Sequence, residues 1–284
     1  MNGFWRIYRR WVLDRRRSTL FWILGLVVII VATAAFYPSL SDSTGESLDS
    51  SSGAMSSLLG LSPGIDPSTP LGFLWIGLYA NIVPWMIMAL GIALGTAAIA
   101  GDEDTGALEY MLARPVTRTA IAFSRFTAAV SVLFVVSTFS ALSLVFSIPL
   151  FGLGDAVTTT APNGSTSIVP GAKSTDVLAG SFAAFAVGAG ILGIAFLLGA
   201  VTGRKNVTVG VASGIAIAGY VLYTLSQMTS SLEFLTWVSP WRWYIDDVML
   251  INGLDWDVLL PFGLAALCGL VGWQVFLRRD LQNP

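Results

Sequence analysis

The chain has 284 residues, of which 55% are hydrophobic and only 11% are charged, and its mean hydropathy is +0.74. A soluble protein carries about 25% charged residues, so this composition excludes a soluble globular domain and indicates a membrane protein. The sequence has no histidine and one cysteine, Cys268. Histidine-dependent catalysis, a cysteine-cluster metal site and an internal disulfide are therefore excluded, and no metal site is predicted.

The first 17 residues, 1–17, predict an amphipathic helix. Five apolar side chains follow one helical face: Phe4, Ile7, Tyr8, Trp11 and Val12. We expect this helix to lie on the inner surface of the bilayer, with its arginines near anionic lipid phosphates. The alternative is a simple topology signal. Cleavage as a signal peptide is disfavoured, because the apolar run that follows is close to a full membrane span.

Six uncharged stretches are each long enough to cross the hydrocarbon core, which takes about 20 helical residues. In lipid the backbone polar groups must be satisfied within the segment, so these stretches are predicted to be helices. The predicted spans lie near residues 19–37, 71–99, 121–150, 177–201, 207–228 and 257–277. The sequence therefore predicts an all-α integral membrane protein with a single transmembrane domain over residues 1–284.

The basic residues lie almost entirely on one side of this topology. Of the 15 Lys and Arg residues, only Lys173 and Arg242 fall on the other side. The positive-inside rule then places both termini in the cytoplasm of a multi-pass plasma-membrane protein. The outer connections, 38–70 and 151–176, are rich in Ser, Thr and Gly and are predicted to be flexible loops.

The inner connection, 101–119, reads GDEDTGALEYMLARPVTRT. Asp104 or Thr105 is a suitable N-cap for a short helix, and Pro115 ends that helix by excluding Arg114 from helical geometry. Three apolar residues form a stripe at i, i+3, i+4 spacing: Leu108, Met111 and Leu112. Two turns are too short to be stable alone. The stripe must pack on lipid, on the protein's own helices or on a partner protein, and the local pattern leaves all three open.

The last outer segment, 229–256, carries charges among aromatic and apolar residues and has a helix breaker at Ser239-Pro240. It is too apolar for a plain loop and too short to cross the membrane twice, so we predict a re-entrant segment. Arg242 and Asp246 are four residues apart and are expected to pair on one helical face.

Span two carries the candidates for a substrate pathway or a hinge: Asn81, Pro84 and Trp85. Simple packing is the alternative for all three. The predicted helix cores contain no carboxylate, which disfavours an ion-coupled carrier. No phosphate-binding loop is present, so this chain does not bind ATP by that route. Glycine pairs four residues apart predict close helix packing, more within the chain than between chains: Gly91 and Gly95, Gly199 and Gly203, Gly210 and Gly214.

Two motifs resemble the permease subunits of type-2 ATP-binding-cassette (ABC) exporters. The inner loop resembles their loop between spans two and three in Glu103, Thr105-Gly106-Ala107-Leu108-Glu109, Leu112 and Pro115-Val116-Thr117-Arg118. Ala107 stands where the family has Thr, and Ser124-Arg125 where it has Gly-Lys. The second motif, which resembles the family's Ser-Pro-Phe-Arg-Tyr segment before span six, is Ser239-Pro240-Trp241-Arg242-Trp243-Tyr244. With six spans and a similar length, the resemblance covers nearly the whole chain.

The resemblance implies that the inner loop is a coupling helix that docks on a separate cytoplasmic ABC ATPase. The residues implied in coupling are Asp104, Thr105, Leu108, Glu109, Met111, Leu112, Arg114, Pro115 and Arg118. It also implies half a transporter, completed by a second copy or a related permease and by two ATPase copies that hold ATP and Mg²⁺. The chain itself would then need no cofactor, bind no nucleic acid and catalyse no reaction. An ion-coupled secondary carrier and a non-transport scaffold or assembly factor are the alternatives.

Overall fold

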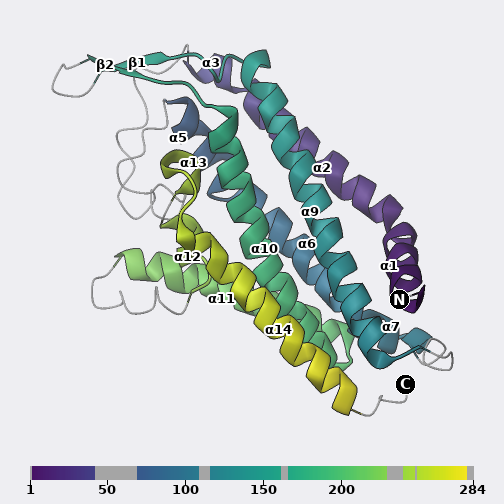
Figure 1. The fold of residues 1–284 in the computed structure, drawn as a ribbon. Helices are drawn as coiled ribbons and strands as arrows, with labels where there is room; N and C mark the ends of the chain where they lie inside the picture. Colours follow the sequence, from purple (N-terminus) through teal and green to yellow (C-terminus); the bar gives the residue numbers. More distant parts are fainter. Residues whose placement is uncertain are drawn as a thin grey trace.

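The structure is a computed structural model that describes residues 2–41, 69–108, 116–160, 166–228, 239–246 and 248–279. The described residues form a bundle of long helices, in which the start of α1 and the end of α14 lie at the same end (Figure 1). The helices are α1 (Asn2–Asp14), α2 (Arg16–Ala35), α3 (Tyr37–Ser41), α5 (Pro70–Leu74), the π-helix η1 (Trp75–Tyr79), α6 (Ile82–Ala98), α7 (Ala100–Glu103), α9 (Arg118–Leu150), α10 (Ser174–Thr202), α11 (Lys205–Met228), α12 (Arg242–Ile245), α13 (Met249–Asn252), the 3-10 helix η3 (Trp256–Val258) and α14 (Leu259–Arg278).

Six helical stretches among the described residues are long and apolar enough to cross a membrane. They are Arg16–Ser39, Pro70–Ala98, Arg118–Leu150, Ser174–Thr202, Lys205–Ser226 and Trp256–Arg278. Their order and positions agree with the six predicted spans, which confirms the prediction of an all-α, six-span membrane protein.

The outer connection 151–176 is more ordered than predicted. It contains a two-stranded antiparallel hairpin, in which β1 (Val157–Thr160) pairs with β2 (Thr166–Val169). The strands consist mostly of Val, Ile and Thr, whose branched side chains suit an extended backbone. Counting only the polar character of this segment therefore missed its strand propensity. The hairpin lies at the end of the bundle opposite to α7 (Figure 1).

Helix α10 is the centre of the bundle and packs against α6, α9, α11 and α14. Two glycines of α6 allow α6 and α10 to pack closely. A Cβ at Gly91 would lie 2.6 Å from the carbonyl oxygen of Gly188, and one at Gly95 would lie 2.5 Å from that of Leu192. This glycine pair therefore serves packing within the chain, as predicted.

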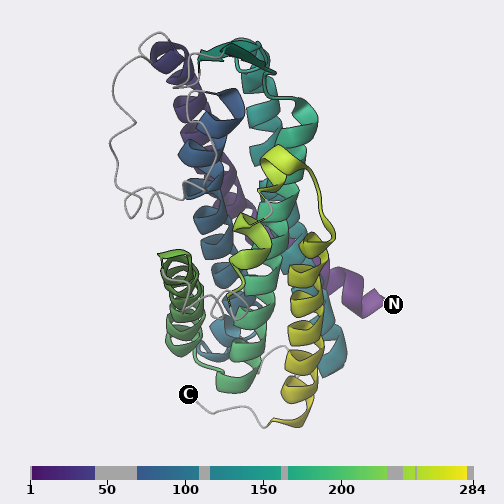
Figure 2. The same ribbon diagram turned by 90° about the vertical axis from the view of Figure 1, so that its left-hand side faces the viewer.

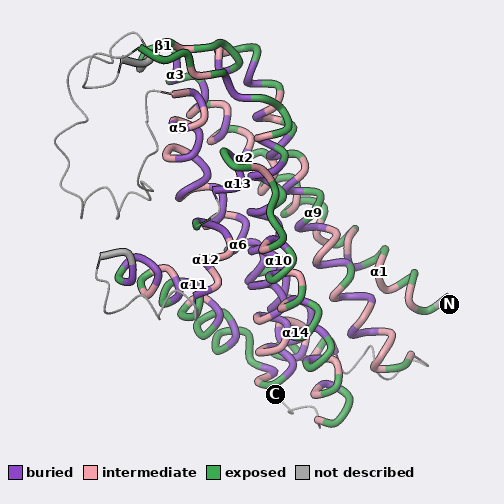
Figure 3. Tube along the Cα trace, turned by 60° about the vertical axis from the view of Figure 1, so that its left-hand side comes forward, coloured by how far each residue is buried: buried purple, intermediate pink, exposed green. Residues whose placement is uncertain are grey.

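Helix α11 stands apart from the other spans, and it packs mainly on α6 and α10 (Figure 2). Much of its surface is exposed (Figure 3). A Cβ added at Gly210 or Gly214 would meet nothing within 4 Å. The prediction that this pair packs within the chain is therefore wrong for the described residues, because the pair lies on the open face of α11.

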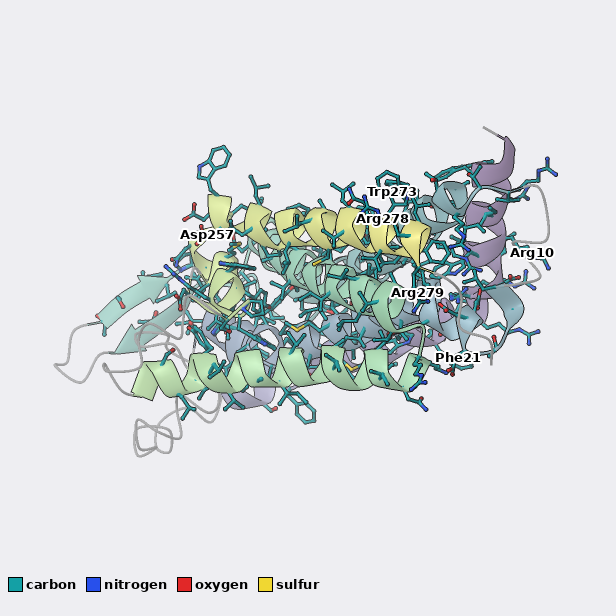
Figure 4. The ribbon with its side chains drawn as sticks, turned by 90° about the horizontal axis from the view of Figure 1, so that it is seen from below. Arg10, Phe21, Asp257, Trp273, Arg278 and Arg279 are labelled. Atoms are coloured by element: carbon teal, nitrogen blue, oxygen red, sulfur yellow. The ribbon has the colours of Figure 1, made fainter. Side chains whose placement is uncertain are left out.

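The N-terminal helix α1 has the predicted apolar face. The five residues predicted to form that face are buried or half-buried, whereas Arg6, Arg9 and Arg10 are exposed. The helix packs against α9 and runs across the direction of α14, with Arg10 at the same end of the bundle as Arg279 (Figure 4). Asp257 lies at the opposite end of α14. The position of α1 relative to a bilayer stays a prediction.

Candidate functional site

The described part of the inner loop begins with a sharp turn out of span two. Helix α6 ends at Ala98, and Ile99 adopts φ −131° and ψ −65°, which directs the chain into the single turn of α7. Asp102 and Glu103 are neighbours on α7 but pair with different spans. Asp102 forms an ion pair with Arg125 of α9, and Glu103 forms one with Arg279 at the end of α14.

Arg125 links the start of α9 to the end of span two. Its side chain is only 2% exposed. One guanidinium nitrogen donates to Asp102, and Nη1 donates to the carbonyl oxygen of Ala98 at 2.9 Å. A cation at the C-terminus of a helix satisfies carbonyl groups that lack a helical partner and complements the helix dipole. Arg125 therefore holds α7 against α9 and caps the C-terminus of α6.

Arg279 makes the equivalent connection to α10 and α14. Its Nη2 donates to the Glu103 carboxylate, and its Nη1 donates to the carbonyl oxygen of Val201 at 2.9 Å. Arg118 in turn donates to the backbone carbonyl of Arg279 at 2.7 Å. Gly203, at φ +64°, ends α10 beside this group, and a Cβ there would lie 2.6 Å from Glu103 Oε1. The left-handed backbone favours glycine here, and a side chain would also displace the Glu103 and Arg279 groups from their positions.

Arg15 attaches the N-terminal helix to the same cluster. Its guanidinium stacks 3.7 Å above the ring centroid of Trp11 and donates to the carbonyl oxygen of Ala97 at 3.3 Å. Burial lowers the pKa of Arg15 from its usual value, and the nearby Asp102 carboxylate opposes that shift. An arginine stays charged in proteins despite such a shift. We call Arg15, Asp102, Glu103, Arg125 and Arg279 the inner charge cluster.

The residues implied in coupling lie in different environments. Asp104 and Thr105 are exposed. The Thr105 hydroxyl donates back to the carbonyl oxygen of Gly101 at 3.2 Å, one turn earlier at α7. The helix that Asp104 or Thr105 was predicted to cap lies mostly outside the described residues, so the N-cap role stays a prediction. Arg118 starts α9 and is bonded to Arg279, as described above. The remaining residues, Glu109, Met111, Leu112, Arg114 and Pro115, lie outside the described residues.

Leu108 is the one residue of the apolar stripe that lies among the described residues. Its side chain is fully buried and belongs to the chain's own hydrophobic core. Of the three possible partners for the stripe, the protein itself therefore covers this residue. Leu108 is not available to a partner protein in this structure.

The pathway and hinge candidates lie at a break in span two. Instead of one continuous helix, the span consists of α5, the π-helix η1 and α6, with Asn81 at the junction in a non-helical conformation. Pro84 lies buried in the first turn of α6, where the missing N–H is tolerated. Trp85 is half-buried, and its ring lies 4.8 Å from that of Trp241 and 5.4 Å from that of Tyr220, between centroids.

The outer segment packs against this break. Trp241 Nε1 donates to the carbonyl oxygen of Ala216 at 2.9 Å, and Tyr244 Oη donates to that of Tyr79 at 2.6 Å. Tyr79 is the last residue of the π-helix, so Tyr244 satisfies a carbonyl group at the point where the regular helical ladder stops. Pro240 packs against Gly219 of α11. The re-entrant depth of the segment stays a prediction.

The predicted pair in the outer segment is confirmed. Arg242 Nε and Asp246 Oδ2 are 3.6 Å apart. The Tyr223 hydroxyl of α11 also donates to Asp246 Oδ1 at 2.6 Å. The pair therefore joins α12 to α11 as well as stabilising a single helical turn.

The residue-by-residue predictions did not include the inner charge cluster as a site. Its acidic and basic members are far apart in the chain: Asp102 and Arg125 are separated by 23 positions, and Glu103 and Arg279 by 176. The available signal was that all of them sit at the ends of apolar stretches, where a charge needs a nearby partner.

These features define a polytopic membrane protein whose inner loop is fastened by ion pairs to several spans. A family model for ABC-2 family transporter proteins matches residues 5–281. The chain therefore belongs to the ABC-2 transporter family and is a multi-pass membrane permease subunit of an ABC transporter, a transport component without catalysis of its own. Family membership implies an ABC ATPase as a partner. No curated protein matches the chain.

Proposed function

We propose that this chain is the membrane subunit of an exporter whose ATP is hydrolysed by a separate cytoplasmic ATPase. In this proposal both termini and the inner loop are in the cytoplasm, the membrane is the plasma membrane, and two ATPase copies hold all of the ATP and Mg²⁺. The substrate is unidentified.

The observation that supports this proposal is that ion pairs hold the start of the inner loop to two spans. Asp104 and Thr105 are exposed, while the two preceding residues, Asp102 and Glu103, are held by ion pairs to α9 and α14. A displacement of the exposed tip would therefore act directly on two spans. An ATPase that docks on the tip and closes on ATP would move those spans, which is the behaviour expected of a coupling loop.

The open face of α11 supports the second part of the proposal, which is pairing with another permease. Gly210 and Gly214 line this face, and exposed apolar residues surround them: Val207, Val209, Val211, Ile217 and Val221. Small residues let two helices approach closely in lipid. We propose that a second copy, or a related permease, packs here.

A pathway between the two halves would then run beside the break in span two. Asn81 lies at that break, and the half-buried Trp85 and Tyr220 lie on α6 and α11. Because α11 carries the proposed pairing face, these aromatic rings would lie close to the two-fold axis. The motion of span two during transport would use the non-helical junction at Asn81 as a hinge.

The proposal is tested by co-purification with an ABC ATPase, sought first among the genes that neighbour the one for this chain. Asp104→Arg reverses a charge at the exposed tip and should abolish co-purification while membrane insertion stays normal, because interface charges set docking register. Asp155→Arg, an exposed carboxylate at the hairpin end, is the matched control and should leave co-purification unchanged. Retained co-purification in Asp104→Arg would count against docking at the tip.

The same preparation separates the alternative functions. Reconstituted with the ATPase, the wild-type chain should support ATP-dependent solute movement and a solute-stimulated ATPase rate. Transport by the chain alone on an ion gradient would indicate a secondary carrier. ATPase binding without any solute response, over a broad solute screen, would indicate a scaffold.

A further inference from the structure

A small cavity lies inside the chain among four of its spans, and its polar lining consists only of hydroxyl groups. Its walls come from α2, η1 with α6, α9 and α10, and the lining residues are Ile30, Tyr79, Val83, Ile87, Ser137, Ser140, Ser181 and Ala184. The cavity lies within one chain, away from both the inner charge cluster and the proposed pairing face on α11.

Ser137 is the unusual member of this group. Seven other hydroxyl side chains of α9 each bond to a carbonyl three or four residues earlier in the helix: Ser124, Thr127, Ser131, Thr138, Ser140, Ser143 and Ser147. This internal bond is the usual way for a hydroxyl to satisfy itself in a membrane helix. Ser137, only 6% exposed, instead lines the cavity, and its Oγ has no partner among the described residues.

The other hydroxyls at the cavity have capacity left for one more bond. Tyr79 Oη and Ser181 Oγ are 2.6 Å apart, and Tyr79 Oη also lies 3.3 Å from the carbonyl oxygen of Val177. Ser140 donates to the carbonyl of Val136 at 2.9 Å. Each hydroxyl oxygen accepts up to two bonds, so the Tyr79 and Ser181 pair on the wall opposite α9 can still accommodate an additional donor.

We propose that this cavity binds one water molecule that bridges Ser137 to the hydroxyls of the opposite wall. The space open to the centre of a water-sized sphere is about 10 Å³, which is about what a single water needs, and a bound water needs two to four polar partners. The lining contains no charged side chain, so the site suits a neutral hydrogen-bonding molecule rather than an ion. Its size excludes the transported solute.

The water would connect Ser137 of α9 to the hydroxyl pair that Tyr79 and Ser181 already form. Tyr79 ends the π-helix of span two, Ser181 belongs to α10 and Ser137 belongs to α9. An unsatisfied hydroxyl within the membrane interior is costly. A bridging water removes that cost and fixes the broken half of span two against α9.

Two experiments on the full chain in lipid nanodiscs test this site. In a density map that resolves other buried waters, we expect a peak at hydrogen-bonding distance, roughly 2.6–3.2 Å, from Ser137 Oγ on α9 and from at least one of Tyr79 and Ser181 on the opposite wall. An empty cavity, or a Ser137 hydroxyl turned to the carbonyl of Leu133, would overturn the proposal.

The second experiment uses the sign of a stability change. If Ser137 is bonded to water, Ser137→Ala removes a partner of a buried water and lowers the melting temperature by about 2–4 °C, the shift expected for a loss near 1 kcal/mol. Ser131→Ala is the control, because that hydroxyl is exposed on the same helix and bonds only to Thr127; it should not lower the melting temperature. A Ser137→Ala variant that melts at the wild-type temperature or above would show that the hydroxyl is unbonded, and would overturn the proposal.

Discussion

Glu103 and Arg279 are 176 residues apart in the sequence, yet they form an ion pair whose carboxylate is only 4% exposed. The pair joins the first turn of the inner loop to the last span, and Arg279 also binds the end of α10 through the carbonyl of Val201. The C-terminal end of α14 is thereby part of the support for the inner loop.

The first prediction concerns the removal of this pair. Glu103→Gln leaves the Arg279 charge largely buried without its counter-ion, and we expect a loss of about 3 kcal/mol in stability, seen as a lower melting temperature in detergent. Arg278→Met removes the exposed neighbouring charge and should have little effect. Similar melting temperatures for the two variants would contradict a structural role for the pair. If the pair transmits motion, Glu103→Gln should also reduce solute-stimulated ATP hydrolysis in the assembled transporter.

The six spans were predictable because each depends on local composition. A stretch that must satisfy its own backbone groups in lipid is recognised from its length and its lack of charge, without knowledge of its neighbours. The i, i+4 pair of Arg242 and Asp246 was predictable for the same reason, since helix geometry alone brings the two residues together.

The inner charge cluster and the burial of Leu108 were not predictable in this way. They depend on which helices are neighbours, and hydropathy says nothing about that. The break in span two illustrates an intermediate case. Asn81 and Pro84 marked the right place, but the local sequence does not show that Tyr244, 165 positions away, donates to the carbonyl of Tyr79 at the end of the π-helix.

The second prediction tests that long-range bond. Tyr244→Phe removes the donor to the Tyr79 carbonyl and leaves a buried acceptor unsatisfied, which costs about 1–3 kcal/mol. Tyr37→Phe is the control: the Tyr37 hydroxyl is buried but has no hydrogen-bond partner among the described residues, so its removal should cost less. The melting temperatures of the two variants give the comparison. A Tyr244→Phe variant that melts no lower than Tyr37→Phe would contradict a stabilising role for the bond to Tyr79.

The third prediction separates the two glycine pairs. Gly95→Leu places a side chain against the backbone of α10, where even a Cβ would lie 2.5 Å from a carbonyl oxygen, so the variant should fail to accumulate as folded protein. Gly214→Leu points into open space and should fold. If α11 carries the pairing face, light scattering of the purified Gly214→Leu variant should give a monomer under conditions where wild type is a dimer. An unchanged dimer would show that the interface does not lie on this face of α11.

The fourth prediction concerns orientation, because docking on a cytoplasmic ATPase requires the tip of the inner loop to be inside the cell. Cys268 is the only cysteine and is buried, so a Cys268→Ser background leaves a chain without thiols. In that background we expect Asp155→Cys, at the hairpin end, to react with a membrane-impermeant maleimide in intact cells. Asp104→Cys should react only after the membrane is opened. The two positions are both exposed and lie at opposite ends of the bundle, so each serves as the control for the other. The reverse pattern would place the loop outside the cell, where no ATP-driven partner could act on it.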